Sequence, residues 1–119
     1  MTPCGAQAFV ADERGMATVE AAIAIAAIVV VLVLCLGAVL AASMQIRCVD
    51  AAREAARLTA RGDGDNAVTS AQRVAPTGAD IGIGGDGDLV IATVSARVPL
   101  LPLLQISARA AAAREPDAQ

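Results

Sequence analysis

The chain has 119 residues, no His, Trp or Tyr, and a net charge of −3 at neutral pH. Its nine cationic residues are all arginines, which excludes an imidazole base, a lysine Schiff base and a histidine-ligated metal site. There is no glycine-rich phosphate loop with its lysine, and no basic patch interleaved with aromatic residues. We therefore expect a protein that is not an enzyme, uses no cofactor or metal, and does not bind nucleic acid.

The first part of the chain, residues 1–15, is a short polar segment that ends in Gly15. A secretory signal peptide has a basic start and an apolar stretch of about 7–15 residues. The apolar stretch that follows here is longer, so we interpret residues 1–15 as an unstructured leader. The alternative is an ordinary signal-peptidase site at Ala41-Ala42-Ser43.

An uncharged segment, residues 21–46, follows directly on the carboxylate of Glu20. As a helix its 26 positions span roughly 39 Å, which exceeds the hydrocarbon core of about 30 Å. We place the membrane-spanning part at residues 21–44. Small residues recur four positions apart in it: Ala22 and Ala26, then Gly37 and Ala41. That spacing lets a second helix approach closely in lipid.

The glycine, the lone glutamate and the apolar helix together resemble the type IV prepilin signal. The matching residues are Arg14-Gly15 and Ala17-Thr18-Val19-Glu20. With the later run Ala51–Arg57 and a small strand-rich tail, the chain is similar to the TadE-like minor pilins, or pseudopilins. These belong to Tad/Flp type IV pilus assembly systems, here in their high-GC Gram-positive form.

This resemblance implies cleavage by prepilin peptidase between Gly15 and Met16, and methylation of the new amine on Met16. It also implies that Glu20, the fifth residue of the mature chain, pairs with the N-terminal amine of a neighbouring subunit. The implied partners are prepilin peptidase, other pilin subunits, inner-membrane Tad platform proteins and membrane lipid. The implied location is the cytoplasmic membrane, crossed once with the N-terminus in the cytoplasm, or the pilus at the cell surface.

The arginine distribution predicts the opposite orientation. The leader side has only Arg14, whereas the other side has four arginines: Arg47, Arg53, Arg57 and Arg61. The positive-inside rule would keep the arginine-rich side in the cytoplasm. We follow the resemblance, because the cleavage signal, the apolar helix and the rest of the chain after it, here called the body, occur in the order that the resemblance requires.

We expect one long helix over residues 16–61. It includes the membrane-spanning part and continues beyond it until Gly62 ends the helix. Arg53, Arg57 and Arg61 form a stripe on it, and Asp50 and Glu54 precede the first two by three residues. The stripe is either a docking face for a partner or a solvated face that pairs with itself, and we favour the second reading.

We expect residues 62–119 to form a small α+β extracytoplasmic domain. Asn66 is the expected cap of a short helix over residues 67–74, which Pro76 ends. Alternation over residues 90–98 predicts a strand with Val90, Ala92, Val94, Ala96 and Val98 on its apolar face. Residues 79–83 supply its partner strand and residues 84–87 the turn.

The leucines between residues 100 and 104 supply either the main core of this domain, which is the reading that we favour, or an exposed surface for a membrane or partner. Residues 105–114 are ambiguous, because alanine favours a helix by propensity. TadE-like chains usually end in a strand, which would put four apolar residues on one face, so we predict a strand: Ile106, Ala108, Ala110 and Ala112. Residues 115–119 are an expected disordered tail.

The predicted fold class is therefore α+β: a long N-terminal transmembrane helix, a short second helix and a small antiparallel sheet of about three strands. Of the three cysteines, Cys35 and Cys48 lie too far apart on one helix for a disulfide, so we expect Cys48 to be unpaired rather than bridged between molecules. Two other functions stay open. One is a secreted binding protein or effector cleaved near Ser43, and the other is an unprocessed single-pass regulatory membrane protein.

Overall fold

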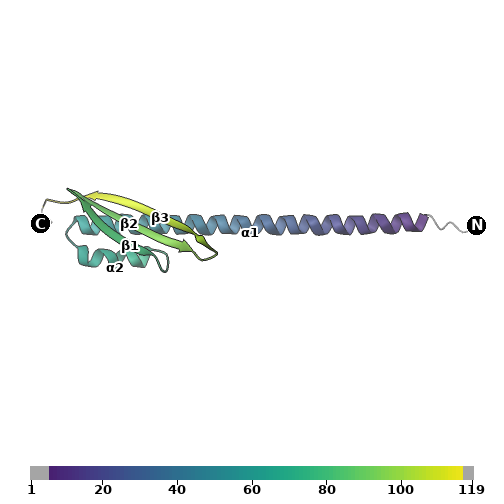
Figure 1. Ribbon diagram of the computed structural model, residues 1–119, viewed down its shortest axis with the longest axis horizontal. Helices are drawn as coiled ribbons and strands as arrows, with labels where there is room; N and C mark the ends of the chain where they lie inside the picture. Colours follow the sequence, from purple (N-terminus) through teal and green to yellow (C-terminus); the bar gives the residue numbers. More distant parts are fainter. Residues whose placement is uncertain (1–5, 117–119) are drawn as a thin grey trace, which may run out of the picture. The chain divides into compact units, whose positions relative to one another are not determined.

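A computed structural model describes the backbone of residues 6–116 and the side chains of residues 13–116. The elements follow in the order α1 (Ala6–Ala60), α2 (Gly64–Val74), β1 (Asp80–Asp86), β2 (Leu89–Val98) and β3 (Leu101–Ala113) (Figure 1). The strands form one antiparallel sheet in the order β1-β2-β3. The predicted α+β class, with a long helix, a short helix and three strands, is confirmed. The chain divides into two compact units, Met1–Ala38 and Val39–Gln119.

Helix α1 begins at Ala6 rather than after Gly15, so the expectation of an unstructured leader is wrong from Ala6 onwards. The earlier residues, including Cys4, lie outside the described part. Residues 6–14 contain no proline or glycine, and lengthening an existing helix needs no new nucleus. A glycine inside a helix costs about 1 kcal/mol relative to alanine, which helical residues on both sides of Gly15 can offset.

The C-terminus of α1 closes as the sequence predicts, at Gly62. This residue adopts φ 87°, and its N–H donates to the carbonyl of Thr59 at 3.0 Å. The N–H of Asp63 donates to the carbonyl of Leu58, also at 3.0 Å. The two bonds form a Schellman motif, which pairs carbonyls that the helix end would otherwise leave free.

Helix α2 begins three residues earlier than expected, and the predicted cap at Asn66 is wrong. The N-cap residue is Asp63, whose side chain makes no capping bond to the backbone. Instead, Asn66 Nδ2 donates to Asp63 Oδ1 at 2.9 Å from within the first turn. The other end follows the prediction, since the helix stops at Val74 and Pro76 comes two residues later.

The first hairpin turns at Gly87-Asp88, so the prediction of a turn over residues 84–87 is wrong. Strand β1 continues through both Gly84 and Gly85, and Asp86 pairs with Leu89. Gly87 has φ 62° whereas Asp88 has no positive φ, as in a type II′ turn. This turn has a twist that matches antiparallel strands, and it extends the ladder by three pairs beyond Ile83.

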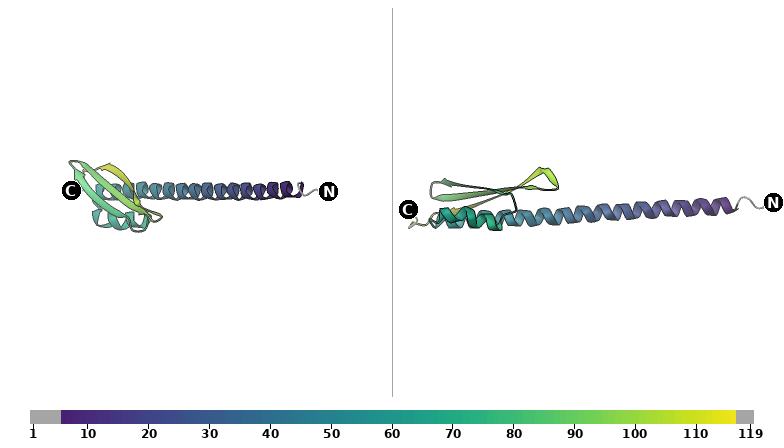
Figure 2. Two further views of the ribbon diagram at one scale, coloured as in Figure 1. Left: turned by 45° about the vertical axis from the view of Figure 1, so that its right-hand side comes forward. Right: turned by 90° about the horizontal axis from the view of Figure 1, so that it is seen from below.

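The core lies between the sheet and the two helices. The sheet covers α2 and the last turns of α1, which lie side by side in one layer (Figure 2). The predicted apolar face of β2 is confirmed, since Val90, Ala92, Val94, Ala96 and Val98 are all at most 6% exposed. The helices contribute mainly alanine to the core: Ala51, Ala52, Ala55 and Ala56 from α1, and Ala71 from α2.

Residues 105–113 form a strand, as predicted, within β3. Ile106, Ala108, Ala110 and Ala112 share the face that packs on the core. Tertiary pairing with β2 outweighs the helix propensity of alanine here. Glu115 does not belong to a disordered tail, because its N–H donates to the carbonyl of Ala60 at 3.0 Å. The last three residues of the expected tail lie outside the described part.

Enlarging a core alanine should destabilise the body. We expect Ala52→Leu, at a position with 0% exposure, to lower the free energy of unfolding by about 1–3 kcal/mol, because the added carbons have no space between α1 and the sheet. The control is Ala111→Leu on the exposed face of β3, which should change it by at most about 0.5 kcal/mol. Thermal unfolding in detergent, followed by circular dichroism, measures both. Equal stability of the two variants would contradict close packing at this contact.

Candidate functional site

The predicted processing and assembly residues lie on an exposed stretch of α1. Met16 is 67% exposed, and Gly15 and Glu20 are exposed as well. A Cβ at Gly15 would meet no atom within 4 Å, so a larger residue fits there without disturbing the fold. Gly15 and Met16 are therefore accessible at the helix surface, while the peptide bond between them lies within α1.

A hydroxyl contact at this stretch was not predicted from the sequence. Thr18 Oγ1 donates to the carbonyl oxygen of Gly15 at 2.8 Å and to that of Arg14 at 3.1 Å. The Gly15 carbonyl belongs to the peptide bond that the prepilin resemblance marks for cleavage. The available signal was a threonine three and four residues after these carbonyls in a helix, where such back-bonding is common.

The following part of α1 is long and apolar enough to cross a membrane, and it belongs to the helical stretch Glu13–Ala60. Its large apolar side chains from Met16 to Leu40 are each between 52% and 68% exposed. Exposed apolar surface is unfavourable in water by about 25 cal/mol for each Å². This segment is therefore suited to lipid or to apolar helices of other chains, which agrees with a membrane location.

The predicted packing residues, for which we expect contact with a second helix, lie at the surface of α1. Ala22 and Ala26 are exposed one turn apart, while Gly37 and Ala41 are partly covered one turn apart further along α1. A Cβ at Gly37 would also meet no atom within 4 Å. Each pair forms a shallow place on the helix surface where another backbone can approach.

The leucine loop, residues 99–104, comprises the turn after β2 and the first four residues of β3, and it is exposed. The favoured reading, in which its leucines supply the main core, is therefore wrong: Leu100 is 74% exposed, Leu101 57%, Leu103 102% and Leu104 46%. The register explains this. Val98 pairs with Leu101 and Arg97 pairs with Gln105, so residues 102–104 have no partner on β2 and bulge away.

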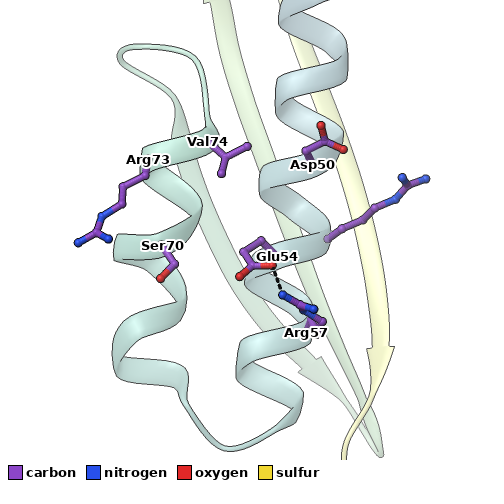
Figure 3. Close-up of a pocket in the computed structure, with 7 residues that line it drawn as sticks. Asp50, Glu54, Arg57, Ser70, Arg73 and Val74 are labelled. Atoms are coloured by element: carbon purple, nitrogen blue, oxygen red, sulfur yellow. Dashed lines mark hydrogen bonds and ion pairs between the residues drawn. The ribbon is translucent and has the colours of Figure 1, made fainter.

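A groove between α1 and α2 collects charged side chains (Figure 3). Glu54 and Arg57 of α1 line it, together with Ser70 and Arg73 of α2. Arg57 Nη2 donates to Glu54 Oε2 at 2.7 Å, and Arg61 Nε forms an ion pair with Glu115 Oε1 at 3.6 Å. Among the described residues, the expected pair of Asp50 with Arg53 does not form. Arg57 thus pairs on its own helix, as in the favoured reading, whereas Arg61 pairs with Glu115 beyond β3, and exposure limits each pair to about 0.2–1 kcal/mol.

Cys48 lies inside the core and is unpaired, as predicted. It is 0% exposed, so a bridge between molecules cannot form without opening the body. Burial raises the pKa of this thiol, because the apolar surroundings disfavour the thiolate, and the positive charge of Arg47 opposes the rise. Its place is a packing position on α1, next to the alanines of the core.

The candidate residues do not converge on one site. Gly15, Met16 and Glu20 belong to the first compact unit, while the leucine loop, the charged groove and Cys48 belong to the second. No cluster of three or more potential metal ligands occurs among residues 13–116. The candidate residues therefore lie on a short exposed stretch of α1 and, in the second unit, at separate places.

These features define a class: an α+β protein with an N-terminal helix capable of crossing a membrane. Comparison with known proteins gives the family. The chain is 57% identical over 97 residues to the Mycobacterium tuberculosis (strain ATCC 25618 / H37Rv) protein named Apoptosis inhibitor Rv3655c, covering 82% of this chain and 78% of that protein. The chain belongs to the same family as that protein. No protein-family model and no solved structure matches it.

The raised pKa of Cys48 predicts that the body loses stability in alkaline solution. Below the ordinary thiol pKa of about 8.5, both folded and unfolded chains keep the proton. Above it the unfolded chain releases the proton while the buried thiol retains it, so stability falls until the pH passes the raised pKa. The melting temperature of the native chain should therefore fall more steeply above about pH 8.5 than that of Cys48→Ala. Parallel curves for the two proteins would show that Cys48 does not contribute.

Proposed function

We propose that this chain is a minor pilin or pseudopilin, a structural component of a Tad/Flp type IV pilus assembly or secretion machine. The observation that carries the proposal is the spacing of Gly15 and Glu20 at the start of an uncharged helix whose apolar side chains are exposed. A subunit of this kind is stored in a membrane by its helix and later buries the same helix against other subunits. The proposed role is structural rather than enzymatic.

In this proposal prepilin peptidase cleaves the bond between Gly15 and Met16. The bond lies within α1, so the enzyme must unwind a turn to reach it. Glycine lowers the cost of unwinding, since it is a weaker helix former than alanine by about 1 kcal/mol. The exposed Thr18 hydroxyl, now bound to the Gly15 carbonyl, would be released in the same step.

Glu20 is the proposed assembly residue. An unpaired carboxylate at the edge of a hydrocarbon layer is unfavourable unless a positive group neutralises it. The amine created on Met16 of a neighbouring subunit would supply that charge. Pairing Glu20 with this amine would also set the axial register between two helices, because each subunit carries one donor, at Met16, and one acceptor, at Glu20, four residues apart.

The proposal places the N-terminus in the cytoplasm, one helix across the cytoplasmic membrane and the body outside. Other pilin subunits would pack on the surfaces around Ala22 and Ala26 and around Gly37 and Ala41. The inner-membrane Tad platform proteins would contact the subunit before its extraction, and the pilus at the cell surface is its proposed final location. This orientation opposes the arginine count on the two sides of the membrane.

Replacing Gly15 should block processing without affecting the fold. We expect Gly15→Leu to keep its first 15 residues, whereas the native chain starts at Met16 in cells that contain prepilin peptidase. The open space around Gly15 removes a steric explanation. Intact mass and N-terminal sequencing of membrane-extracted protein, with and without the peptidase, make the measurement. An unprocessed native chain in both samples would rule out this maturation and leave a regulatory membrane protein.

Removing the charge of Glu20 should separate cleavage from assembly. We expect Glu20→Gln to be cleaved like the native chain but to lose at least about tenfold in recovery with other pilin subunits, which corresponds to about 1.4 kcal/mol. The matched control is Glu13→Gln, which removes an exposed carboxylate of the same helix from the leader. Quantitative mass spectrometry of sheared filaments and detergent complexes gives the ratio. Normal incorporation of Glu20→Gln would contradict the assembly role.

The name of the relative supports a second candidate, an effector that inhibits apoptosis. Such a protein would have to leave the membrane, and cleavage near Ser43 would release it. The core begins at Met44 and Cys48, so a cut there would leave the packed body complete. The N-terminal measurement distinguishes the candidates: a start at Met16 in the membrane supports the pilin, and a soluble product that starts near Ser43 supports the effector.

A further inference from the structure

Four of the six large apolar side chains that are exposed in the described part of the second unit outside α1 belong to the leucine loop: Leu100, Leu101, Leu103 and Leu104. We propose that this loop is a second membrane contact, whose leucines insert among lipid acyl chains beside the end of the membrane-spanning helix. The inference rests on the membrane-anchored stage of the proposed function, and it adds a lipid-binding surface to the body itself.

Two contacts show how the hairpin of β2 and β3 runs along α1. Gln45 Nε2 donates to the carbonyl of Ser107 at 3.4 Å, and the N–H of Glu115 donates to the carbonyl of Ala60 at 3.0 Å. Between these contacts α1 advances about 22 Å at 1.5 Å per residue. Strand β3 and its extension advance about 26 Å at 3.3 Å per residue. The strand and the helix therefore run in the same direction and nearly parallel.

The same arithmetic places the leucine loop at the level of the apolar segment. Gln105 precedes Ser107 by two residues, so it lies about 7 Å further back along the strand. This distance equals between four and five helix residues, which is the level of Leu40 and Ala41. The loop extends beyond Gln105, because residues 102–104 bulge from the ladder. It thus lies beside the last apolar turns of α1.

This level coincides with the edge of the hydrocarbon core. The uncharged segment has 26 residues, and about 20 are enough to cross the core. If the core begins at Ala21 it ends near Leu40, and if it ends at Met44 the loop lies inside it. For either position of the helix, the leucines reach the acyl chains of the nearer leaflet.

The loop and its charges suit a lipid surface rather than water. Pro99 and Pro102 lack a backbone N–H, so the loop brings fewer unpaired donors into an apolar layer. The exposed Arg97 pairs with Gln105 at the base of the loop, where it can reach a lipid phosphate. Residues 89–114 contain three arginines and no acidic residue, so the hairpin has the opposite charge to anionic lipid headgroups.

Tryptophan fluorescence tests the contact directly, since the chain has no tryptophan or tyrosine. Leu103→Trp introduces one reporter at a position that is 102% exposed, where it cannot disturb packing. Leu89→Trp is the matched control at the opposite end of the hairpin, and Leu32→Trp reports on the spanning helix. Each full-length variant is reconstituted into phosphatidylcholine and phosphatidylglycerol vesicles, with and without bromine on the acyl chains.

We expect brominated lipid to remove most of the emission of Leu103→Trp and of Leu32→Trp, and little of that of Leu89→Trp. Bromine near the headgroup end of the acyl chain should quench Leu103→Trp more than bromine near its methyl end, because the loop enters only the nearer leaflet. Water-like, unquenched emission from Leu103→Trp beside a quenched Leu32→Trp would overturn this inference while leaving the membrane helix intact. Blue-shifted but unquenched emission that grows with protein density would assign the loop to a second copy instead. An unquenched Leu32→Trp would remove the membrane stage and this inference together.

Discussion

The contact between α1 and the sheet is lined by alanines on the helix side and by alternating valine and alanine on β2. Residues 16–119 include no aromatic residue that could fill a wider gap, so helix and sheet must approach closely. A buried methyl group contributes only about 0.8 kcal/mol, and many small contacts must therefore form together. The body accordingly depends on the last turns of α1, which supply a large share of its core.

This dependence has a consequence for assembly. The helix that packs against the sheet is the same continuous helix that carries Gly15, Glu20 and the apolar segment. Cys48 marks where the two uses meet, since it is the first fully buried residue after the uncharged stretch. In the proposed pilin, the segment that leaves the membrane and the segment that packs against the sheet would thus be parts of one helix.

One apolar surface is buried inside the body, and two others are exposed. Strand β2 buries its alternating face against the helices, whereas the side chains of the apolar segment and the leucine loop remain exposed. The loop is exposed because the pairing register between β2 and β3 shifts after Arg97 and leaves residues 102–104 without partners. Its exposure thus results from strand pairing.

The sequence by itself determined the features that depend on local pattern. The uncharged length of residues 21–46 predicted the helix, the alternation from Val90 to Val98 predicted β2, and Gly62 and Pro76 predicted two helix ends. Each depends on neighbouring residues or on a backbone angle that one residue type favours. The Gly15 to Glu20 spacing is likewise a linear signal, and the candidate site could be read from it before any fold was known.

Only the tertiary structure decided the features that depend on pairing between distant residues. Gly84 and Gly85 looked like a turn, but their partners Ile91 and Val90 hold them in the ladder and move the turn to Gly87-Asp88. The alanines of residues 108–113 favour a helix by propensity, but β2 holds them as a strand. By sequence the leucine loop could have filled the core of the body, but the pairing register of β2 and β3 leaves it exposed. In each case contacts between residues far apart in the chain outweigh a local preference worth less than about 1 kcal/mol per residue.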